Sequence, residues 1–186
     1  MAKVIAICGS LRKASLNRAL VRSLPALAPE GMEIAEAPPI GTLPLYDADI
    51  QAKGFPDAVT ALGEAIRAAS GVIIVTPEYN YSVPAPLKNA IDWVSRLPNQ
   101  PFQNKPVCMM SVSPGALGGA RAQYHLRQIF VFLESFVFNR PEVMVTMAGS
   151  KFEMVDNAPT TLSDQPTKDV IKQNLAGFAK LIAKVA

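Results

Sequence analysis

The chain has 186 residues and a formal net charge of +3, a length that suits one domain over residues 1–186. No window concentrates lysine and arginine as nucleic-acid-binding proteins do, and no hydrophobic run reaches the ~18 residues of a membrane span. The hydrophobic run at the N-terminus is too short for a signal peptide, so we expect a cytoplasmic protein that binds neither nucleic acid nor membrane.

Short hydrophobic runs alternate with longer amphipathic segments along the chain. The runs predict strands at Lys3–Cys8, Met32–Ala35, Val72–Thr76, Pro106–Val112 and Glu142–Thr146. The amphipathic segments predict helices at Leu16–Ala28, Pro56–Ala69, Pro86–Leu97, Ala120–Phe136 and Lys168–Val185. Two polar, proline-containing stretches predict irregular structure at residues 36–55 and a surface excursion at residues 149–165.

This alternation predicts the fold. Strands without interrupting polar residues, separated by helices, are typical of a parallel sheet covered on both faces. The pattern predicts a flavodoxin-like three-layer α/β/α sandwich with five parallel strands in the order 2-1-3-4-5. Ligands bind such sheets at the carboxyl ends of the strands, so the loops after Cys8, Thr76 and Val112 are the expected site.

The segment after the first strand, GSLRKASLN, predicts an anion site. A helix N-terminus offers unpaired N–H groups and a positive dipole end, and Ser10, Arg12 and Ser15 add donors suited to a phosphate. The alternative is that Ser15 only caps the helix and Arg12 is a solvated loop residue. The position directly after strand 1 of this fold favours the phosphate interpretation.

Three other site types do not fit this segment. The G-x-G-x-x-G dinucleotide motif and the Walker P-loop are both absent, so a single phosphate is expected rather than a pyrophosphate. A phosphatase needs an arginine six residues after its cysteine, but Arg12 lies four residues after Cys8. Cys8 and Cys108 instead lie in hydrophobic runs without metal spacing, which predicts buried reduced thiols and no metal site.

The third predicted strand ends in a loop that leads into a helix, and this stretch reads TPEYNYSVPAPLKNAIDW. Prolines on both sides reduce its conformational freedom, which favours a preformed pocket wall. Its backbone groups suit the edge of a flat heterocycle, while the tyrosines suit a ring face. A protein interface rich in tyrosine is the alternative, and both uses are compatible. A phosphoacceptor domain is excluded because the acidic residues it needs are missing.

GSLRKASLN, TPEYNYSVPAPLKNAIDW and SPGALGGAR together resemble the NADPH-dependent FMN reductase family, in particular its bacterial quinone and chromate reductases. The resemblance spans nearly the whole chain. It implies a flavodoxin-like fold, tightly but non-covalently bound FMN, NAD(P)H as electron donor, and a dimer or tetramer.

The resemblance also implies roles for individual residues. The FMN phosphate would be held by Ser10, Arg12, Ser15, Leu16 and Asn17. The isoalloxazine would be lined by Pro77, Glu78, Tyr79, Asn80 and Tyr81, with Ser113 and Gly115 on its other side or on the ribityl chain. A hydrogen-bond network between subunits would involve Arg121, Tyr124 and Glu142.

The residues themselves suggest no catalytic side chain. The single histidine, His125, has no nucleophile motif, and we expect it to be structural and away from the three loops. The chemistry then belongs to a cofactor. The hypothesis is a ping-pong NAD(P)H oxidoreductase in which hydride passes through FMN to a quinone, with chromate as a further acceptor. Arg96 has two possible roles. It either adds positive electrostatic potential near the opening of the site, where it would bind substrate, or it complements the dipole of its own helix.

The alternative function is a flavodoxin-like FMN module that transfers electrons without oxidising NAD(P)H, and a third possibility is a flavin-free scaffold. Flavodoxins are usually acidic, whereas this chain carries +3, which favours the reductase. Charged residues make up 18% of the chain against about 25% in typical domains, and the predicted helix at residues 120–136 is apolar on two faces. A tightly covered core helix or a subunit contact explains that helix, and the low charge favours the contact.

Overall fold

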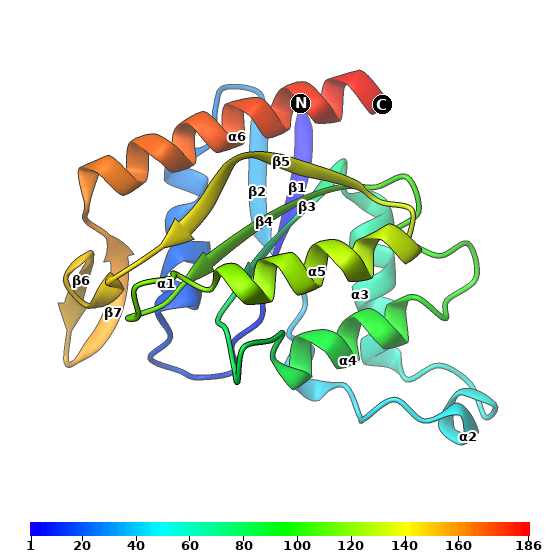
Figure 1. The fold of residues 1–186 in the computed structure, drawn as a ribbon. Helices are drawn as coiled ribbons and strands as arrows, with labels where there is room; N and C mark the ends of the chain where they lie inside the picture. The colour runs from blue at the N-terminus through cyan, green and yellow to red at the C-terminus, as the bar shows by residue number, and fades with distance from the viewer.

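A parallel sheet of five strands forms the centre of the protein (Figure 1). The computed structural model describes all residues, 1–186. The strands are β1 (Ala2–Cys8), β2 (Met32–Glu36), β3 (Gly71–Thr76), β4 (Pro106–Val112) and β5 (Phe136–Val145), in the order β2-β1-β3-β4-β5. The predicted flavodoxin-like sheet and its strand order are confirmed. The order reverses between β1 and β3, so a crevice opens at the carboxyl ends of these strands.

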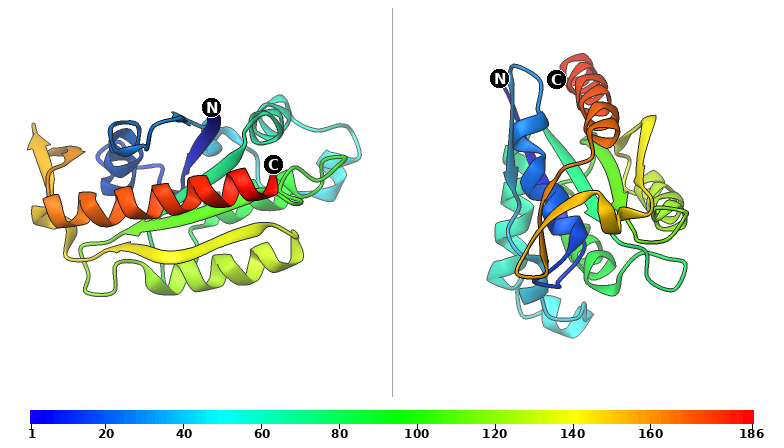
Figure 2. Two further views of the ribbon diagram at one scale, coloured as in Figure 1. Left: turned by 90° about the horizontal axis from the view of Figure 1, so that it is seen from above. Right: turned by 90° about the vertical axis from the view of Figure 1, so that its left-hand side faces the viewer.

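Helices cover both faces of the sheet (Figure 2). The helices are α1 (Leu16–Ser23), α2 (Ala48–Gln51), α3 (Asp57–Ala68), α4 (Ala85–Val94), α5 (Ala120–Phe132) and α6 (Gln165–Val185). One core cluster joins α1 and α6 to the sheet, and the other joins α3, α4 and α5 to its opposite face. Every residue of β3 and β4 is buried, which explains their unbroken hydrophobic runs.

The register of the sheet brings the ends of the three functional strands together. Cys8 of β1 pairs with Val75 of β3, and Thr76 of β3 pairs with Ser111 of β4. The loops that follow β1, β3 and β4 therefore all begin at the carboxyl ends of the strands and surround one crevice. The pairing of the strands alone therefore brings three stretches that are distant in sequence to the same place.

Several predicted elements differ from the structure, and α1 ends at Ser23 where the prediction continues to Ala28. The fifth helix ends at Phe132, and Phe136 begins β5, which starts earlier than the predicted strand. Residues 149–165 are not a simple surface excursion: β6 (Phe152–Val155) and β7 (Ala158–Leu162) form an antiparallel hairpin. Phe152 and Leu162 are buried in the core beside α1, which anchors this hairpin. The sequence did not predict the hairpin because its buried residues, Phe152, Pro159 and Leu162, form no continuous hydrophobic run.

Short 3-10 helices complete the chain at Pro25–Leu27, Ile40–Thr42 and Ala148–Ser150. The second of these, with α2, lies within residues 36–55, where irregular structure was expected. No helix in the structure has the length and apolar character needed to cross a membrane.

Candidate functional site

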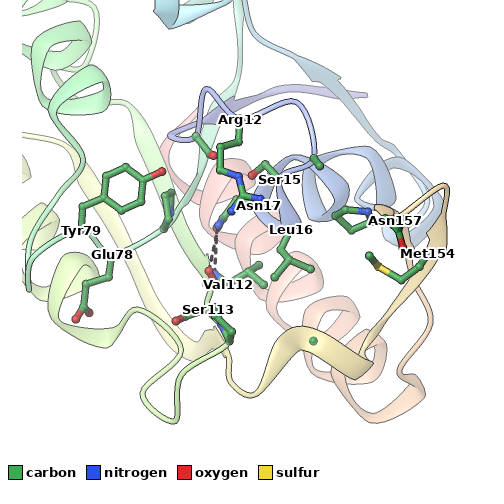
Figure 3. Close-up of a pocket in the computed structure, with 16 residues that line it drawn as sticks. Arg12, Ser15, Leu16, Asn17, Glu78, Tyr79, Val112, Ser113, Met154 and Asn157 are labelled. Carbon is green, nitrogen blue, oxygen red and sulfur yellow. Dashed lines mark hydrogen bonds between the residues drawn. The ribbon is translucent and has the colours of Figure 1, made fainter.

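A cavity of about 330 Å³ lies at the carboxyl ends of β1, β3 and β4 (Figure 3). Its volume falls within the ~300–1,000 Å³ of ordinary ligand sites. The segments after β1, β3 and β4 all contribute to its wall, as the topology predicts. The predicted residues that line it are Ser10, Arg12, Ser15, Leu16, Asn17, Pro77, Glu78, Tyr79 and Ser113.

The β1–α1 segment, residues 10–17, leaves its backbone donors free. No backbone N–H from Ser10 to Asn17 donates a hydrogen bond within the protein. Ser15 caps α1 by accepting a hydrogen bond from the Arg18 N–H at 3.3 Å, so the first turn points its remaining N–H groups outward. Arg12 is exposed and forms no ion pair in the chain. These donors make one anion-binding end of the cavity.

Asn17 ties this segment to the sheet. Its side-chain amide donates to the Val112 carbonyl at 3.0 Å, and its carbonyl accepts from the Val112 N–H at 3.1 Å. The side chain is buried and spans from α1 to the end of β4. The N-terminus of α1 is therefore fixed relative to the loop that begins at Ser113, and Asn17 lines the cavity mainly as a brace.

The β3–α4 loop, residues 77–84, is braced by its own backbone. The Tyr79 N–H donates to the Ser82 carbonyl at 3.0 Å, and the Ser82 N–H donates to the Tyr79 carbonyl at 2.9 Å. Asn80 and Tyr81 between them have positive φ values of 48° and 67°, as in a type I′ turn. The predicted rigid loop is thus held by a miniature hairpin, with prolines at both ends.

Glu78 joins this loop to α5. Its carboxylate accepts hydrogen bonds from the Arg121 N–H at 3.0 Å and the Ala122 N–H at 3.4 Å, and from the Arg121 guanidinium at 2.6 Å. Gly119, the residue before α5, has no side chain to cap the helix, so Glu78 supplies the missing cap. The Arg121 guanidinium also lies 3.7 Å from the centre of the Tyr81 ring.

His125 lies against the same loop, so the expectation that it is remote is wrong. Its Nδ1 is 2.9 Å from the Ser82 hydroxyl. His125 is one helical turn after Arg121, and both therefore face the Tyr79–Ser82 turn from α5. The sequence placed His125 on the correct helix, but the direction of α5 relative to this loop was not predictable from spacing.

The comparisons with known proteins agree with this geometry. Residues 2–150 match the family described as NADPH-dependent FMN reductase. This chain belongs to that family.

Individual members of this FMN reductase family match over nearly the whole chain. A quinone reductase of Escherichia coli (strain K12) is 52% identical over 184 residues, covering 98% of this chain and 96% of the relative. An NAD(P)H-dependent FMN reductase of Pseudomonas aeruginosa is 47% identical, covering 93% and 91%. The structure of FerB, a flavoenzyme NAD(P)H:(acceptor) oxidoreductase from Paracoccus denitrificans, aligns with a TM-score of 0.87 at 32% identity, covering 99% and 98%.

Several predicted residues of this FMN reductase lie outside the cavity lining. Asn80 and Tyr81 form the tip of their turn, and Gly115 lies just past the lining residues Ser113 and Pro114. Arg96 is exposed near the carboxyl end of α4, with its guanidinium 5.5 Å from the centre of the Tyr46 ring. Because α4 runs back from the β3–α4 loop, its last turn lies toward the amino ends of the strands, away from the cavity.

The three predicted interface residues form two groups within one chain. The Tyr124 hydroxyl lies 3.5 Å from the Glu142 carboxylate, whereas Arg121 pairs with Glu78. Tyr124 is exposed, and the same face of α5 continues to Val131 and Phe132, which are 77% and 86% exposed. The apolar second face of α5 is therefore uncovered in the single chain.

The cavity also has a wall that the sequence did not reveal. Met154, Asn157 and Pro159 of the β6–β7 hairpin line it, together with Gly149. The sequence predicts a surface excursion at residues 149–165, and its composition gives no indication of a ligand site. The signal that could have been used is the pair Asp156-Asn157, which favours a tight turn between two short strands.

Both cysteines are buried thiols without a partner. Burial raises the pKa of Cys8, which lies under the β1–α1 segment and donates weakly to the Ser10 carbonyl. Burial raises the pKa of Cys108 to about 12, although its hydrogen bond to Asn174 acts in the opposite direction. A protonated thiol is a poor nucleophile, so neither residue is placed or charged for covalent catalysis.

Proposed function

We propose that this chain is an FMN-dependent NAD(P)H oxidoreductase that reduces quinones, with residues 1–186 acting as one flavin-binding domain. The observation that carries the proposal is the run of unpaired N–H groups from Ser10 to Asn17 at the switch point of a flavodoxin-like sheet. Membership of the FMN reductase family and 52% identity to a quinone reductase support it.

The donors of the β1–α1 segment fit the phosphate of FMN. A phosphate dianion accepts hydrogen bonds only, and the segment offers backbone N–H groups, the Ser10 and Ser15 hydroxyls and the Arg12 guanidinium. Leu16 and Asn17 contribute through their backbone at the first turn of α1. No acidic side chain from this segment faces the cavity, so nothing there opposes a double negative charge.

The β3–α4 loop fits the flavin ring. The N–H groups of Glu78 and Asn80 have no partner within the protein and are free to meet ring acceptors. The Tyr79–Ser82 turn keeps them in place before any ligand binds. We place the isoalloxazine along residues 77–81, with Ser113 and Gly115 on its other side or on the ribityl chain.

FMN bound here would supply the two-electron chemistry that connects NAD(P)H oxidation to quinone reduction in a ping-pong cycle. The chain contributes binding and orientation: Glu78 and Arg121 fix the loop, and Arg12 offsets the phosphate charge. Donor and acceptor use the same exposed side of the site in turn. Chromate is a further acceptor that we propose for the same site, and FMN bound here would supply the electrons for it.

The test is flavin uptake followed by turnover. Purified protein, stripped of ligand and mixed with FMN, is expected to bind it and acquire the yellow flavin absorbance. The complex should then oxidise NADH or NADPH steadily with benzoquinone and no added reductase. Uptake of FMN without NAD(P)H oxidation would indicate an electron-transfer module, and the absence of any flavin uptake would overturn the proposal.

We also propose a homodimer or homotetramer in the cytoplasm. The exposed face of α5 carries Tyr124, Val131 and Phe132, and covering it would bury apolar area that a monomer leaves in water. Arg121, Tyr124 and Glu142 would then extend their contacts between subunits. The unpaired Cys8 and Cys108 suit a reducing compartment.

Sedimentation equilibrium of the Phe132→Ser variant tests this assembly. The substitution should weaken association, because Phe132 is the most exposed of the large side chains on α5. Leu45→Ser is the control, since Leu45 is 79% exposed but lies far from α5 in the chain and beside α4. A monomeric parent protein at micromolar concentration would contradict the proposal.

A further inference from the structure

The β6–β7 hairpin stands beside the N-terminal end of α1 (Figures 1 and 2). The Leu162 N–H donates to the Ser23 hydroxyl at 2.9 Å, which joins the base of the hairpin to the last turn of α1. From that point β7 extends along α1 toward its first turn, so the tip of the hairpin reaches the anion-binding end of the helix. Phe152 and Leu162 are buried, which holds the hairpin in this position.

The tip presents two side chains to the cavity. Asp156 and Asn157 have φ values of 48° and 59°, so they form a tight turn between the strands. Asn157 and Met154 line the cavity, and Figure 3 shows them beyond Leu16, on the side away from Tyr79. The β3–α4 loop and the hairpin tip are therefore at opposite ends, with the β1–α1 segment between them.

Contacts within the chain leave both side chains available to a ligand. The Asn157 amide forms no hydrogen bond with any protein group, whereas its backbone conformation requires only a residue that tolerates positive φ. Met154 is 52% exposed although it faces a cavity, so a ligand would cover apolar surface that is now in contact with water. A free donor and an uncovered apolar group facing one cavity indicate contact with a bound molecule.

We propose that the hairpin tip is the phosphate-side wall of the flavin site and selects a flavin monophosphate over a dinucleotide. The Asn157 amide donates to the terminal phosphate, opposite the donors of Arg12 and Ser15. Met154 occupies the path along which a second nucleotide would continue from that phosphate. This inference rests on the proposed FMN site and adds its specificity.

Asn157 suits this role better than its neighbour. An amide offers an N–H donor to a phosphate, whereas a carboxylate such as that of Asp156 repels it. Asp156 does not line the cavity, so the turn places the neutral residue toward the anion. Exchanging the amide at residue 157 for a carboxylate should therefore act on the phosphate alone.

Equilibrium titration of the ligand-free protein with FMN, riboflavin and FAD, followed by flavin fluorescence, tests the proposal. The parent protein is expected to bind FMN at least tenfold more tightly than FAD. Asn157→Asp should raise the Kd for FMN tenfold or more and leave the Kd for riboflavin unchanged. Asn157→Gly, which keeps the positive φ without strain, should weaken FMN binding severalfold and again spare riboflavin.

Met154→Ala tests the barrier to a dinucleotide. The ratio of the FAD and FMN dissociation constants should fall at least threefold, because the side chain that blocks the second nucleotide is shortened. Val155→Ala is the matched control: Val155 is 57% exposed but does not line the cavity, since neighbouring strand residues point to opposite faces. Thermal melting of each variant shows that the hairpin remains folded.

The outcomes separate the two proposals. If the parent protein binds no flavin, both the proposed function and this inference fail. If the parent binds FMN but folded Asn157 variants bind FMN as tightly as it does, or the parent binds FAD as tightly as FMN, the inference alone is overturned. Equal losses for FMN and riboflavin in Asn157→Asp would also overturn it, because the effect would then not depend on the phosphate.

Discussion

The β1–α1 segment and the β3–α4 loop line the same cavity but are held in opposite ways. In residues 10–17 no backbone N–H is used within the protein, and the Asn17 side chain ties the segment to the end of β4. In residues 77–84 the loop forms its own turn and is bound to α5 through Glu78, Tyr81 and Ser82.

This difference reflects what each region must bind. A phosphate needs many donors around it, and donors already used inside the protein are not available to the ligand. A flat ring needs a wall of fixed shape, and a wall that is braced before binding loses less conformational entropy when the ligand arrives. We therefore expect substitutions in the first region to act on ligand affinity and substitutions in the second to act on stability.

Asn17→Ala is the largest expected exception, because it removes both hydrogen bonds that join the β1–α1 segment to the end of β4. The Val112 N–H and carbonyl would both lose their side-chain partner in a buried position, which costs about 3 kcal/mol of unfolding free energy. Urea unfolding of the ligand-free protein measures this loss. Ser15→Ala, which removes only a helix cap, should cost about 1 kcal/mol, and equal losses for the two variants would contradict the assignment.

Hydrogen exchange should separate the two regions directly. Without flavin, the amides of residues 10–17 should exchange fast, while those of Tyr79 and Ser82 are already protected by their mutual hydrogen bonds. FMN at one hundred times its Kd should raise the free energy of exchange of the amides of residues 10–17 by about 2.7 kcal/mol. Equal protection of both regions in the ligand-free protein would remove the contrast between them.

Glu78→Ala should weaken the braced loop and the start of α5 together. The loss of the helix cap and of a partly exposed ion pair should cost about 2 kcal/mol, which lowers Tm by about 4–8 °C in a domain of this size. Glu64→Ala provides the control, since its exposed pair with Arg67 should contribute below about 0.5 kcal/mol. A Tm change no larger than that of the control would show that Glu78 is not a brace.

Arg12→Ala should affect binding and leave stability unchanged. Loss of the guanidinium should raise the Kd for FMN about tenfold, equal to about 1.4 kcal/mol, because one charge-assisted donor to the phosphate is removed. Riboflavin binding and Tm should stay at parent values, since Arg12 has no partner in the chain. The neighbouring exposed Lys13 does not line the cavity, so Lys13→Ala should bind FMN as the parent does.

Ser82→Ala should give the smallest effect. It removes the hydroxyl that contacts His125 Nδ1 but keeps the backbone pair with Tyr79. A loss of about 0.5–1 kcal/mol in unfolding free energy is expected, with FMN affinity within a factor of two. His125→Ala should match it, and the double variant should lose no more than either single one if the two groups act through this bond.

The sequence predicted the sheet because burial leaves a simple pattern. The runs of β3 and β4 are hydrophobic throughout, so their place in the middle of a covered sheet follows from composition. The β1–α1 segment was also identifiable, since serine and arginine at the start of a helix after strand 1 have a direct physical use. Both features depend on short stretches of neighbouring residues.

The parts that were missed depend on contacts between distant residues. The hairpin at Phe152–Leu162 is anchored in the core by Phe152 and Leu162, while the residues between them show no continuous hydrophobic run. The contact between Ser82 and His125 depends on the angle at which α5 crosses the β3–α4 loop, which no local pattern encodes. The two alternatives for Arg96 could not be separated for the same reason, because the direction of α4 decides whether its last turn lies near the cavity.

The buried thiol of Cys108 is a natural probe of how often the protein opens locally. The residue is fully buried in the middle of β4, and its pKa of about 12 keeps it protonated at neutral pH, whereas an unfolded cysteine has a pKa near ~8.5. An alkylating reagent therefore reaches this thiol only when β4 opens. The rate of labelling at Cys108 therefore reports how often β4 opens, with no introduced probe and no denaturant.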